Sequence, residues 1–315
     1  MQAPRDYLLI FLKGMGMGAA DVVPGVSGGT IAFITGIYER LLNAIKSVDV
    51  EALKLLSKFR WTAFWQKIDG SFLFPLLFGI GVSLVVLSNQ VEYLLKEHPI
   101  PLWSFFFGLI VISAIWVARE VKRWRPATIL SSLIGIGVAY SITVLSSAQT
   151  PEQFWFIFLC GMIAICAMVL PGISGSFILI LLGKYVYIIT ALNERDFLTI
   201  GIFALGCMVG LLSFARVVSW LLNKYHDLAI ALLAGFMVGS LNKVWPWKET
   251  LETMIDRHGE TKPVLQKSIF PETYQNLGSE PHLVQALLFM ALGVLLVIAL
   301  EKLAQYLKRG QYEKA

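Results

Sequence analysis

Long apolar stretches alternate with short polar segments along the whole chain. A transmembrane helix needs about 20 apolar residues, and six stretches reach or approach that length. Four further apolar stretches are shorter and form two pairs, each flanking a segment rich in glycine and proline. The pattern predicts an all-α polytopic membrane protein with about six full transmembrane helices and two re-entrant helical hairpins. The predicted spans are 72–91, 102–119, 127–147, 197–222, 228–245 and 282–302, and the hairpin arms are 7–20 with 30–46 and 154–170 with 177–192.

The two segments between the hairpin arms are near-copies of each other. Residues 24–29 read P-G-V-S-G-G, and residues 171–176 read P-G-I-S-G-S. Proline and glycine at this density end a helix. A break at membrane depth exposes backbone polar groups, so it is tolerated only where it is buried in protein or lines a cavity. Two matched breaks therefore indicate the binding site of a transporter at the interface of two repeats, and we expect the two motifs to meet there.

The match between the two halves extends past these motifs into the following spans. Each half consists of a hairpin followed by two spans, and one additional span separates the halves. An odd number of crossings reverses the second copy, so the sequence predicts an inverted-topology repeat. Two unrelated helix kinks that share glycine by chance are the alternative. The aligned positions are Gly36, Tyr38, Ala44, Val91, Leu94, Leu95, Gly108, Val111 and Ser113 with Gly183, Tyr185, Ala191, Val218, Leu221, Leu222, Gly235, Val238 and Ser240.

Basic residues give the predicted orientation in the membrane. The segment 46–67, the run 119–125 and the C-terminal tail are rich in lysine and arginine, whereas the loop 148–153 has neither. Basic loops stay in the cytoplasm, so both termini are expected there. The predicted parts are a first repeat 1–125 (hairpin 7–46, amphipathic surface segment 47–69, two spans), a linking span 126–150, a second repeat 151–247, an external loop 248–281, and a final span with a basic tail 282–315.

Composition narrows the class of protein further. The chain is 57% hydrophobic and only 15% charged, which excludes a soluble domain. The net charge of +5 reflects basic cytoplasmic loops and indicates no nucleic-acid partner. The partners expected are membrane phospholipids and the substrate, and the sequence leaves a homo-oligomer open. The three cysteines lie in apolar segments without the spacing of a disulfide framework or a metal site.

The hairpin motifs supply the groups of an anion-binding site. Each motif ends where the second arm of its hairpin begins, and backbone N–H groups at a helix N-terminus attract phosphate or carboxylate. Serine and threonine hydroxyls add donors. The same hydroxyls could instead only cap the broken helices, and the sequence does not separate the two roles. The candidate residues are Pro24, Gly25, Ser27, Gly28, Gly29 and Thr30 in the first motif, and Pro171, Gly172, Ser174, Gly175 and Ser176 in the second.

Charged residues inside the apolar segments are further candidates, because a charge costs several kcal/mol to insert into a membrane. Asp21 precedes the first motif, and its counterpart in the second half is Met168. We expect Asp21 to titrate, to bind a cation, or to face a basic residue. Arg40, Lys184 and Arg216 are the basic candidates, although Arg40 and Arg216 could simply extend to the membrane surface.

No set of residues indicates an enzyme. Zinc-protease and nucleophile-elbow motifs are absent, and no histidine is placed to activate Ser27, so an intramembrane serine hydrolase is a weak alternative. No phosphate-binding loop for ATP occurs either. We expect no cofactor, and a coupling ion, H⁺ or Na⁺, remains open.

The segment Gly14–Ile45, with its core D-V-V-P-G-V-S-G-G-T, closely resembles the bacterial PopT family of polyprenyl-phosphate translocases. The second motif, L-P-G-I-S-G-S at 170–176, is similar to that family's second motif, and the resemblance runs from Tyr7 to about Trp247. It implies a multi-pass carrier in the bacterial inner membrane that returns undecaprenyl phosphate from the outer to the cytoplasmic leaflet for reuse in cell-envelope synthesis. An ion-coupled transporter of a small soluble anion is the alternative.

Overall fold

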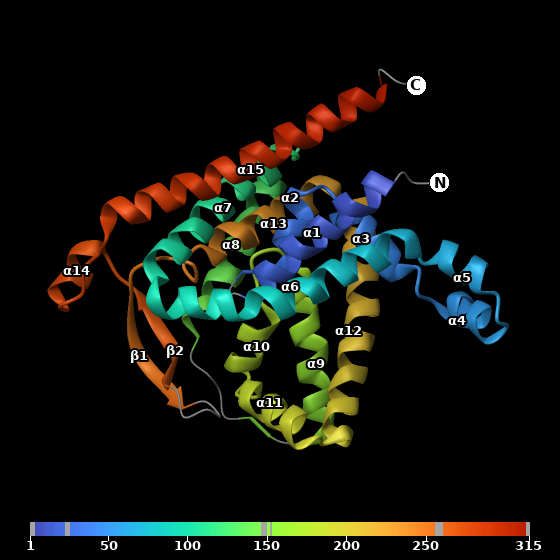
Figure 1. Cartoon of the computed structure of the whole chain (residues 1–315), viewed down its shortest axis with the longest axis horizontal. Helices are drawn as coiled ribbons and strands as arrows, with labels where there is room; N and C mark the ends of the chain where they lie inside the picture. Colours follow the sequence, from blue (N-terminus) through green and yellow to red (C-terminus); the bar gives the residue numbers. More distant parts are fainter. Residues whose placement is uncertain (1–3, 23–25, 146–149, 152, 256–260, 313–315) are drawn as a thin grey trace.

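The structure, a computed structural model, describes residues 4–22, 26–145, 150–151, 153–255 and 261–312. Regular structure in this part of the chain is helical apart from one two-stranded sheet (Figure 1). The elements are α1 (Pro4–Val22), α2 (Gly28–Ile34), α3 (Tyr38–Lys46), α4 (Val50–Ser57), α5 (Trp61–Lys67), α6 (Gly70–Glu97), α7 (Pro99–Arg119), α8 (Pro126–Val144), α9 (Phe154–Val169), α10 (Gly175–Leu181), α11 (Tyr185–Glu194), α12 (Phe197–Lys224), α13 (His226–Ser240), β1 (Lys248–Ile255), β2 (Thr261–Ser268), α14 (Pro271–Asn276) and α15 (Leu283–Tyr312).

Four of the described helices are long and apolar enough to cross a membrane, namely α6, α7, α8 and α12. The bent pair α10 and α11 makes a fifth if it is counted as one span. The sequence predicted about six spans, and the other two correspond to shorter apolar helices, α13 and residues Leu283–Ala299 of α15. The predicted span 228–245 is shorter as a helix because the chain turns after Ser240, where the Lys243 amide donates to the Ser240 carbonyl (2.8 Å).

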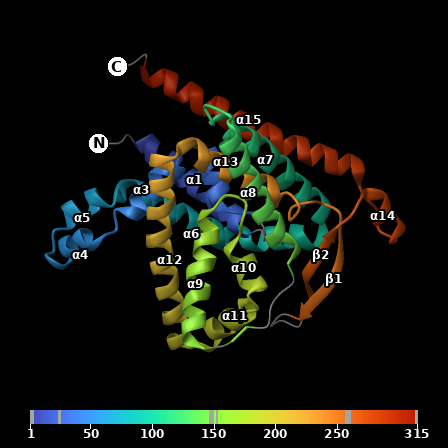
Figure 2. The ribbon, with the colours of Figure 1, turned by 180° about the vertical axis from the view of Figure 1, so that it is seen from behind.

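The first helix of each hairpin packs against the first span that follows it in the same half. In this way α1 lies along α6, and α9 lies along α12 (Figures 1 and 2). A Cβ atom on Gly14 would lie 2.2 Å from the Leu76 carbonyl oxygen, and one on Gly161 would lie 2.3 Å from that of Phe203. Both crossings bring two backbones together where only glycine fits. Gly14 and Gly161 are separated by the same number of residues as the two motifs.

The remaining long helices pair across the two halves. α7 of the first half packs along α15, and α13 of the second half packs along α8. α8 and α15 each follow these spans in the chain, so they hold corresponding places in the two halves. The sequence analysis treated α8 only as a link, because α8 and α15 share no visible motif.

The loop 248–281 contains regular structure that the hydrophobic pattern did not predict. β1 and β2 pair in antiparallel register from Lys248 opposite Ser268 to Ile255 opposite Thr261, with an irregularity between Thr250 and Thr253. The short helix α14 follows the hairpin. The strands alternate polar and apolar residues only weakly, which explains why a search for long apolar runs missed them.

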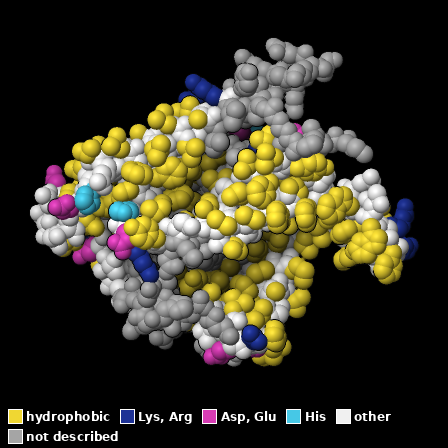
Figure 3. Space-filling view, viewed as in Figure 1, with side chains coloured by type: hydrophobic (Ala, Val, Ile, Leu, Met, Phe, Trp, Pro, Cys, Tyr) yellow, Lys and Arg dark blue, Asp and Glu magenta, His cyan; other side chains and the backbone are white. Residues whose placement is uncertain are grey.

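Apolar side chains cover much of the outer surface of the helical body (Figure 3). Such a surface suits lipid, since a soluble protein rarely exposes so large an apolar area. The predicted amphipathic segment 47–69 forms α4 and α5, which project from the body (Figure 1). Val50, Trp61 and Trp65 are exposed there, as is typical of helices that lie in a membrane interface.

The main apolar core encloses the two hairpin motifs. Val26 and Ala32 of the first hairpin and Ile173 and Ile178 of the second are buried in one cluster with Met237 of α13. The core therefore holds both motifs at the centre of the protein rather than at its surface.

Candidate functional site

The first motif leads from α1 into α2, and its described part, residues 26–30, is here called tip one. Pro24 and Gly25 lie outside the described residues. Ser27 has an extended backbone and caps α2, because its Oγ accepts from the Gly29 amide (3.0 Å). The Asp21 Oδ1 atom accepts from the Gly28 amide (2.7 Å). The first two amides of α2 are thus satisfied by side chains of the same hairpin.

The second motif forms tip two (residues 171–176) between α9 and α10. Its turn depends on Gly172, whose φ of +90° favours glycine and whose Cβ would lie 2.7 Å from the Ser240 Oγ atom. Ser174 occupies the cap position of α10 but makes no side-chain cap bond. Its Oγ instead lies 2.8 Å from that of Ser176.

The two tips contact each other directly, as the sequence analysis predicted. Ser27 donates its hydroxyl to the carbonyl of Met168 (2.9 Å), at the end of α9. The Gly172 amide donates to the Thr30 hydroxyl (3.0 Å). Ser27, Thr30, Gly172 and Ser174 are all buried. Two segments more than 140 residues apart thus share hydrogen bonds in the protein interior.

The second arm of each hairpin is bent, whereas the sequence analysis treated it as one continuous stretch. α2 ends at Ile34 and α10 ends at Leu181, and two residues after each end lies a glycine with positive φ, Gly36 and Gly183. Each end has the Schellman pattern: the amide of Ile37 donates to the Ala32 carbonyl (2.9 Å), and that of Lys184 to the Leu179 carbonyl (2.8 Å). α10 and α11 meet at 112°. The aligned glycines therefore mark matched bends.

Lys184 lies at this bend and not in the middle of a helix. Its side chain is only 3% exposed, and its Nζ donates to the Thr150 carbonyl (2.8 Å). It also lies 5.6 Å from the ring centre of Tyr187. Lys184 thus ties the loop before α9 to the bend after α10.

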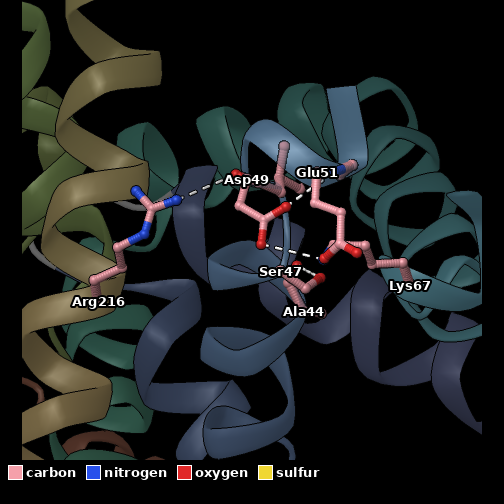
Figure 4. Close-up of polar contacts among 8 residues, drawn as sticks. Ala44, Ser47, Asp49, Glu51, Lys67 and Arg216 are labelled. Carbon is pink, nitrogen blue, oxygen red and sulfur yellow. Dashed lines mark hydrogen bonds and ion pairs between the residues drawn. The ribbon is translucent and has the colours of Figure 1, made fainter. Parts of the chain in front are cut away.

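Arg40 and Arg216 lie on the side of the molecule formed by α3 to α5. Arg40 binds Asp69 through two hydrogen bonds (2.7 and 3.0 Å) and borders a cavity of about 400 Å³. Arg216 is exposed and donates to the carbonyls of Leu212 (3.2 Å) and Val48 (3.4 Å). Figure 4 shows Arg216 reaching from α12 toward the segment that Lys67 binds from its other side through Asp49 and Glu51.

Of the three roles expected of Asp21, contact with a basic residue is not seen among the described residues. Among the described residues, the Asp21 carboxylate has no ion-pair partner within 4 Å, and its hydrogen bond goes to the Gly28 amide. Arg40 pairs with Asp69 instead. The Asp21 carboxylate therefore stabilises the backbone of tip one through its hydrogen bond to the Gly28 amide.

Two lysines that the sequence analysis passed over lie beside tip two. The Lys243 Nζ lies 4.0 Å from the ring centre of Phe177, the residue that follows the second motif. The Lys248 Nζ donates to the Lys243 carbonyl (2.6 Å) and lies 3.8 Å from the ring centre of Trp103. Burial, and then the neighbouring Lys243, hold the pKa of Lys248 well below its ordinary value. The sequence does mark these lysines, because Lys243 and Lys248 flank Trp245 and Trp247 at the end of an apolar segment.

Comparisons with known proteins point to one family. Residues 17–262 match the family described as "VCA0040-like: Undecaprenyl phosphate translocase-like". A protein of Vibrio cholerae serotype O1 (strain ATCC 39315 / El Tor Inaba N16961) named "Polyprenyl-phosphate transporter" is 44% identical over 301 residues, which cover 95% of this chain and 98% of the relative. One of Staphylococcus aureus (strain NCTC 8325 / PS 47) with the same name is 31% identical over 75% of this chain and 85% of its own length. No solved structure matches this chain significantly.

Proposed function

Because this chain belongs to the undecaprenyl phosphate translocase-like family, whose members are transporters and not enzymes, we propose that it carries undecaprenyl phosphate from the outer to the cytoplasmic leaflet. The carrier lipid would then be available again for cell-envelope synthesis. The names of both relatives support a polyprenyl phosphate as substrate and do not favour a small soluble anion.

The observation that carries this proposal is the hydrogen-bonded contact between the two tips. The Ser27 hydroxyl donates to the Met168 carbonyl of the opposite hairpin, and the Thr30 hydroxyl accepts from the Gly172 amide. A phosphate oxygen accepts the same kind of hydrogen bond that a carbonyl accepts, and it attracts backbone amides more strongly because it is charged. A phosphate head that enters between the tips would therefore replace the tip-to-tip bonds, while the isoprenoid tail stays in lipid.

Movement of one half against the other would then change the side from which the head group is accessible. The matched contacts of α1 with α6 and α9 with α12 support a repeat, and we propose that the repeat is inverted in the membrane, with the hairpins re-entrant from opposite sides. In this arrangement the first hairpin enters from the cytoplasm and the second from outside. Rocking about the shared tips gives alternating access.

Charge on the phosphate needs a cationic partner in a site with little water. We propose that Arg40, Lys184 or Arg216 takes this role during transport, after leaving the partners seen here. Lys184 is the most direct candidate, because it lies at the bend that follows α10. A coupling ion, H⁺ or Na⁺, would supply the energy, and Asp21 is the carboxylate placed at a tip.

Transport is tested with purified protein in liposomes that contain a polyprenyl phosphate in one leaflet. We expect the protein to move the phosphate lipid faster than the corresponding polyprenol. The variant Thr30→Val should slow this movement, because it removes a hydroxyl of the site without changing the shape of the side chain. Uptake of inorganic phosphate without movement of the lipid would refute the proposal in favour of a small-anion transporter.

Orientation is tested separately with single cysteines in a cysteine-free background. Ser57→Cys in α4 and Gln153→Cys before α9 lie at exposed positions. An impermeant thiol reagent should label the first from the cytoplasm and the second from outside. Labelling of both from the same side would refute the inverted arrangement and leave the lipid-transport assay unaffected.

A further inference from the structure

Lys243 and Lys248 are held next to tip two by several independent contacts. The turn that carries Lys243 begins at Ser240, and Ser240 lies against Gly172 of the tip. Phe177, which directly follows the tip, lies under the Lys243 ammonium group at 4.0 Å. Lys248 reaches back from β1 to the Lys243 carbonyl. Both side chains thus belong to the surroundings of the second motif.

In the described part of the chain, neither lysine has an acidic side chain as its partner. Among the described residues, no carboxylate oxygen lies within the 4 Å ion-pair distance of either ammonium group. Phe177 and Trp103 contact the two cations with their ring faces, and an aromatic face offsets only part of the cost of removing a cation from water. Both lysines are half-buried. An anion bound beside the two ammonium groups would favour the charged form of both lysines.

We propose that Lys243 and Lys248 add a second pair of cations to the substrate site, besides the basic residues named above, and bind the phosphate-monoester head group beside tip two. This inference rests on the function proposed above and specifies which residues recognise the head group. A phosphate monoester carries between one and two negative charges near neutral pH, so two lysines match its charge. Their aromatic neighbours also suit the first isoprene units of the lipid, because isoprene is apolar.

The half-buried position of the two lysines affects which anions they bind. A surface lysine would bind any anion from water weakly, since water screens the charge. Lysines between Phe177 and Trp103 are partly removed from water, which strengthens their attraction to a phosphate. The site would therefore favour a head group that is delivered at the membrane over a dissolved anion.

The test compares binding of a short-chain polyprenyl phosphate, the corresponding polyprenol and inorganic phosphate to the full-length protein in detergent, by equilibrium titration. Lys243→Gln and Lys248→Gln should each weaken binding of the phosphate lipid about 10- to 100-fold, the range for a lost hydrogen bond to a charged group. Binding of the polyprenol should not change. Lys243→Arg and Lys248→Arg should retain most of the affinity, because they keep the charge.

Lys224→Gln is the matched control, since Lys224 also lies over aromatic rings, at 5.5 Å from Trp220 and 5.4 Å from Tyr225, but is exposed. It should bind like wild type. The inference is overturned if both glutamine variants bind the phosphate lipid as wild type does. It is equally overturned if the arginine variants lose as much affinity as the glutamine variants, because the lysines would then act only in packing. Tighter binding of inorganic phosphate than of the phosphate lipid would overturn the lipid as ligand. If wild type prefers the polyprenol, the proposed function itself fails.

Discussion

Tip one and tip two have nearly the same sequence, but in the part of the chain that the structure describes only the helix that starts at tip one has its first amides bound by side chains of its own hairpin. Asp21 and Ser27 accept the first two amides of α2, whereas Ser174 contacts only the hydroxyl of Ser176. Tip one also supplies both hydroxyls of the tip-to-tip contact, from Ser27 and Thr30. The second hairpin contributes backbone groups to that contact, the Met168 carbonyl and the Gly172 amide.

The difference follows from particular aligned positions. Asp21 aligns with Met168, and Thr30 aligns with Phe177, so the second copy has apolar side chains where the first has polar ones. Phe177 in turn faces Lys243. An acid therefore lies at one tip and a cation beside the other. The two copies share a backbone plan but differ in chemistry, and substitutions at aligned positions should have unequal effects.

Gly29→Ala should have the largest effect of these substitutions. A Cβ atom at Gly29 would lie 2.6 Å from the Val169 carbonyl oxygen, so a methyl group forces the tips apart. Overpacking of this kind costs about 1–3 kcal/mol, and it displaces both hydroxyls from tip two. We expect strongly reduced thermal stability in detergent and loss of lipid movement in liposomes.

Two controls locate this effect at the contact between the tips. Gly81→Ala places a methyl group in open space on α6 and should leave stability and transport unchanged. Ser176 is aligned with Gly29 and already carries a side chain, so Ser176→Ala should be mild. Equal losses for Gly29→Ala and Ser176→Ala would show that the tips are equivalent after all.

Much of this asymmetry could not be predicted from the sequence. The two breaks and their meeting were predictable, because a repeated proline–glycine motif in an apolar chain has few acceptable locations. The bends at Gly36 and Gly183 were visible only as aligned glycines, since a helix C-terminus inside an apolar run leaves no polar signal. The partner of Arg40, Asp69, lies 29 residues away, and no local pattern connects them.

The lysines beside tip two were also hidden from sequence reasoning. Lys243 and Lys248 come at the end of an apolar segment, where lysine normally extends to the membrane surface. Their contact with Phe177 and Trp103 joins three distant parts of the chain. Only the folded arrangement shows that these two cations adjoin the second motif.

Thr30→Val should have the next largest effect. Valine keeps the shape of threonine but cannot accept from the Gly172 amide, which remains buried. A buried amide without an acceptor costs about 1–3 kcal/mol. Thermal unfolding in detergent should show the loss. Thr35→Val is the matched control, because the Thr35 hydroxyl donates only to carbonyls of its own helix, and a comparable loss there would contradict a special role for Thr30.

Asp21→Asn should be milder, because asparagine still offers an oxygen to the Gly28 amide. The loss of charge turns a charge-assisted hydrogen bond into a neutral one, a difference of about 1 kcal/mol. We expect a changed turnover or a changed pH dependence of transport, with the affinity for the phosphate lipid preserved. Transport assays measure the turnover and titrations measure the affinity, so both on the same preparation separate an effect on turnover from an effect on binding. An affinity that falls together with turnover would place Asp21 in the binding of the head group.

Ser174→Ala should have the smallest effect, although Ser174 aligns with Ser27. Ser27 makes two hydrogen bonds, one to the Gly29 amide and one to the Met168 carbonyl, so Ser27→Ala removes a helix cap and a contact between the hairpins. Loss of such a cap alone costs about 1 kcal/mol. Ser174→Ala removes the contact with the Ser176 hydroxyl. Ser176 is partly exposed, so its hydroxyl can bind water instead. The unfolding temperature of Ser174→Ala should therefore stay close to that of wild type, while that of Ser27→Ala falls. Equal falls in both variants would mean that Ser174 caps α10 in a conformation other than the one seen here, and the asymmetry of the tips would then belong to this conformation alone.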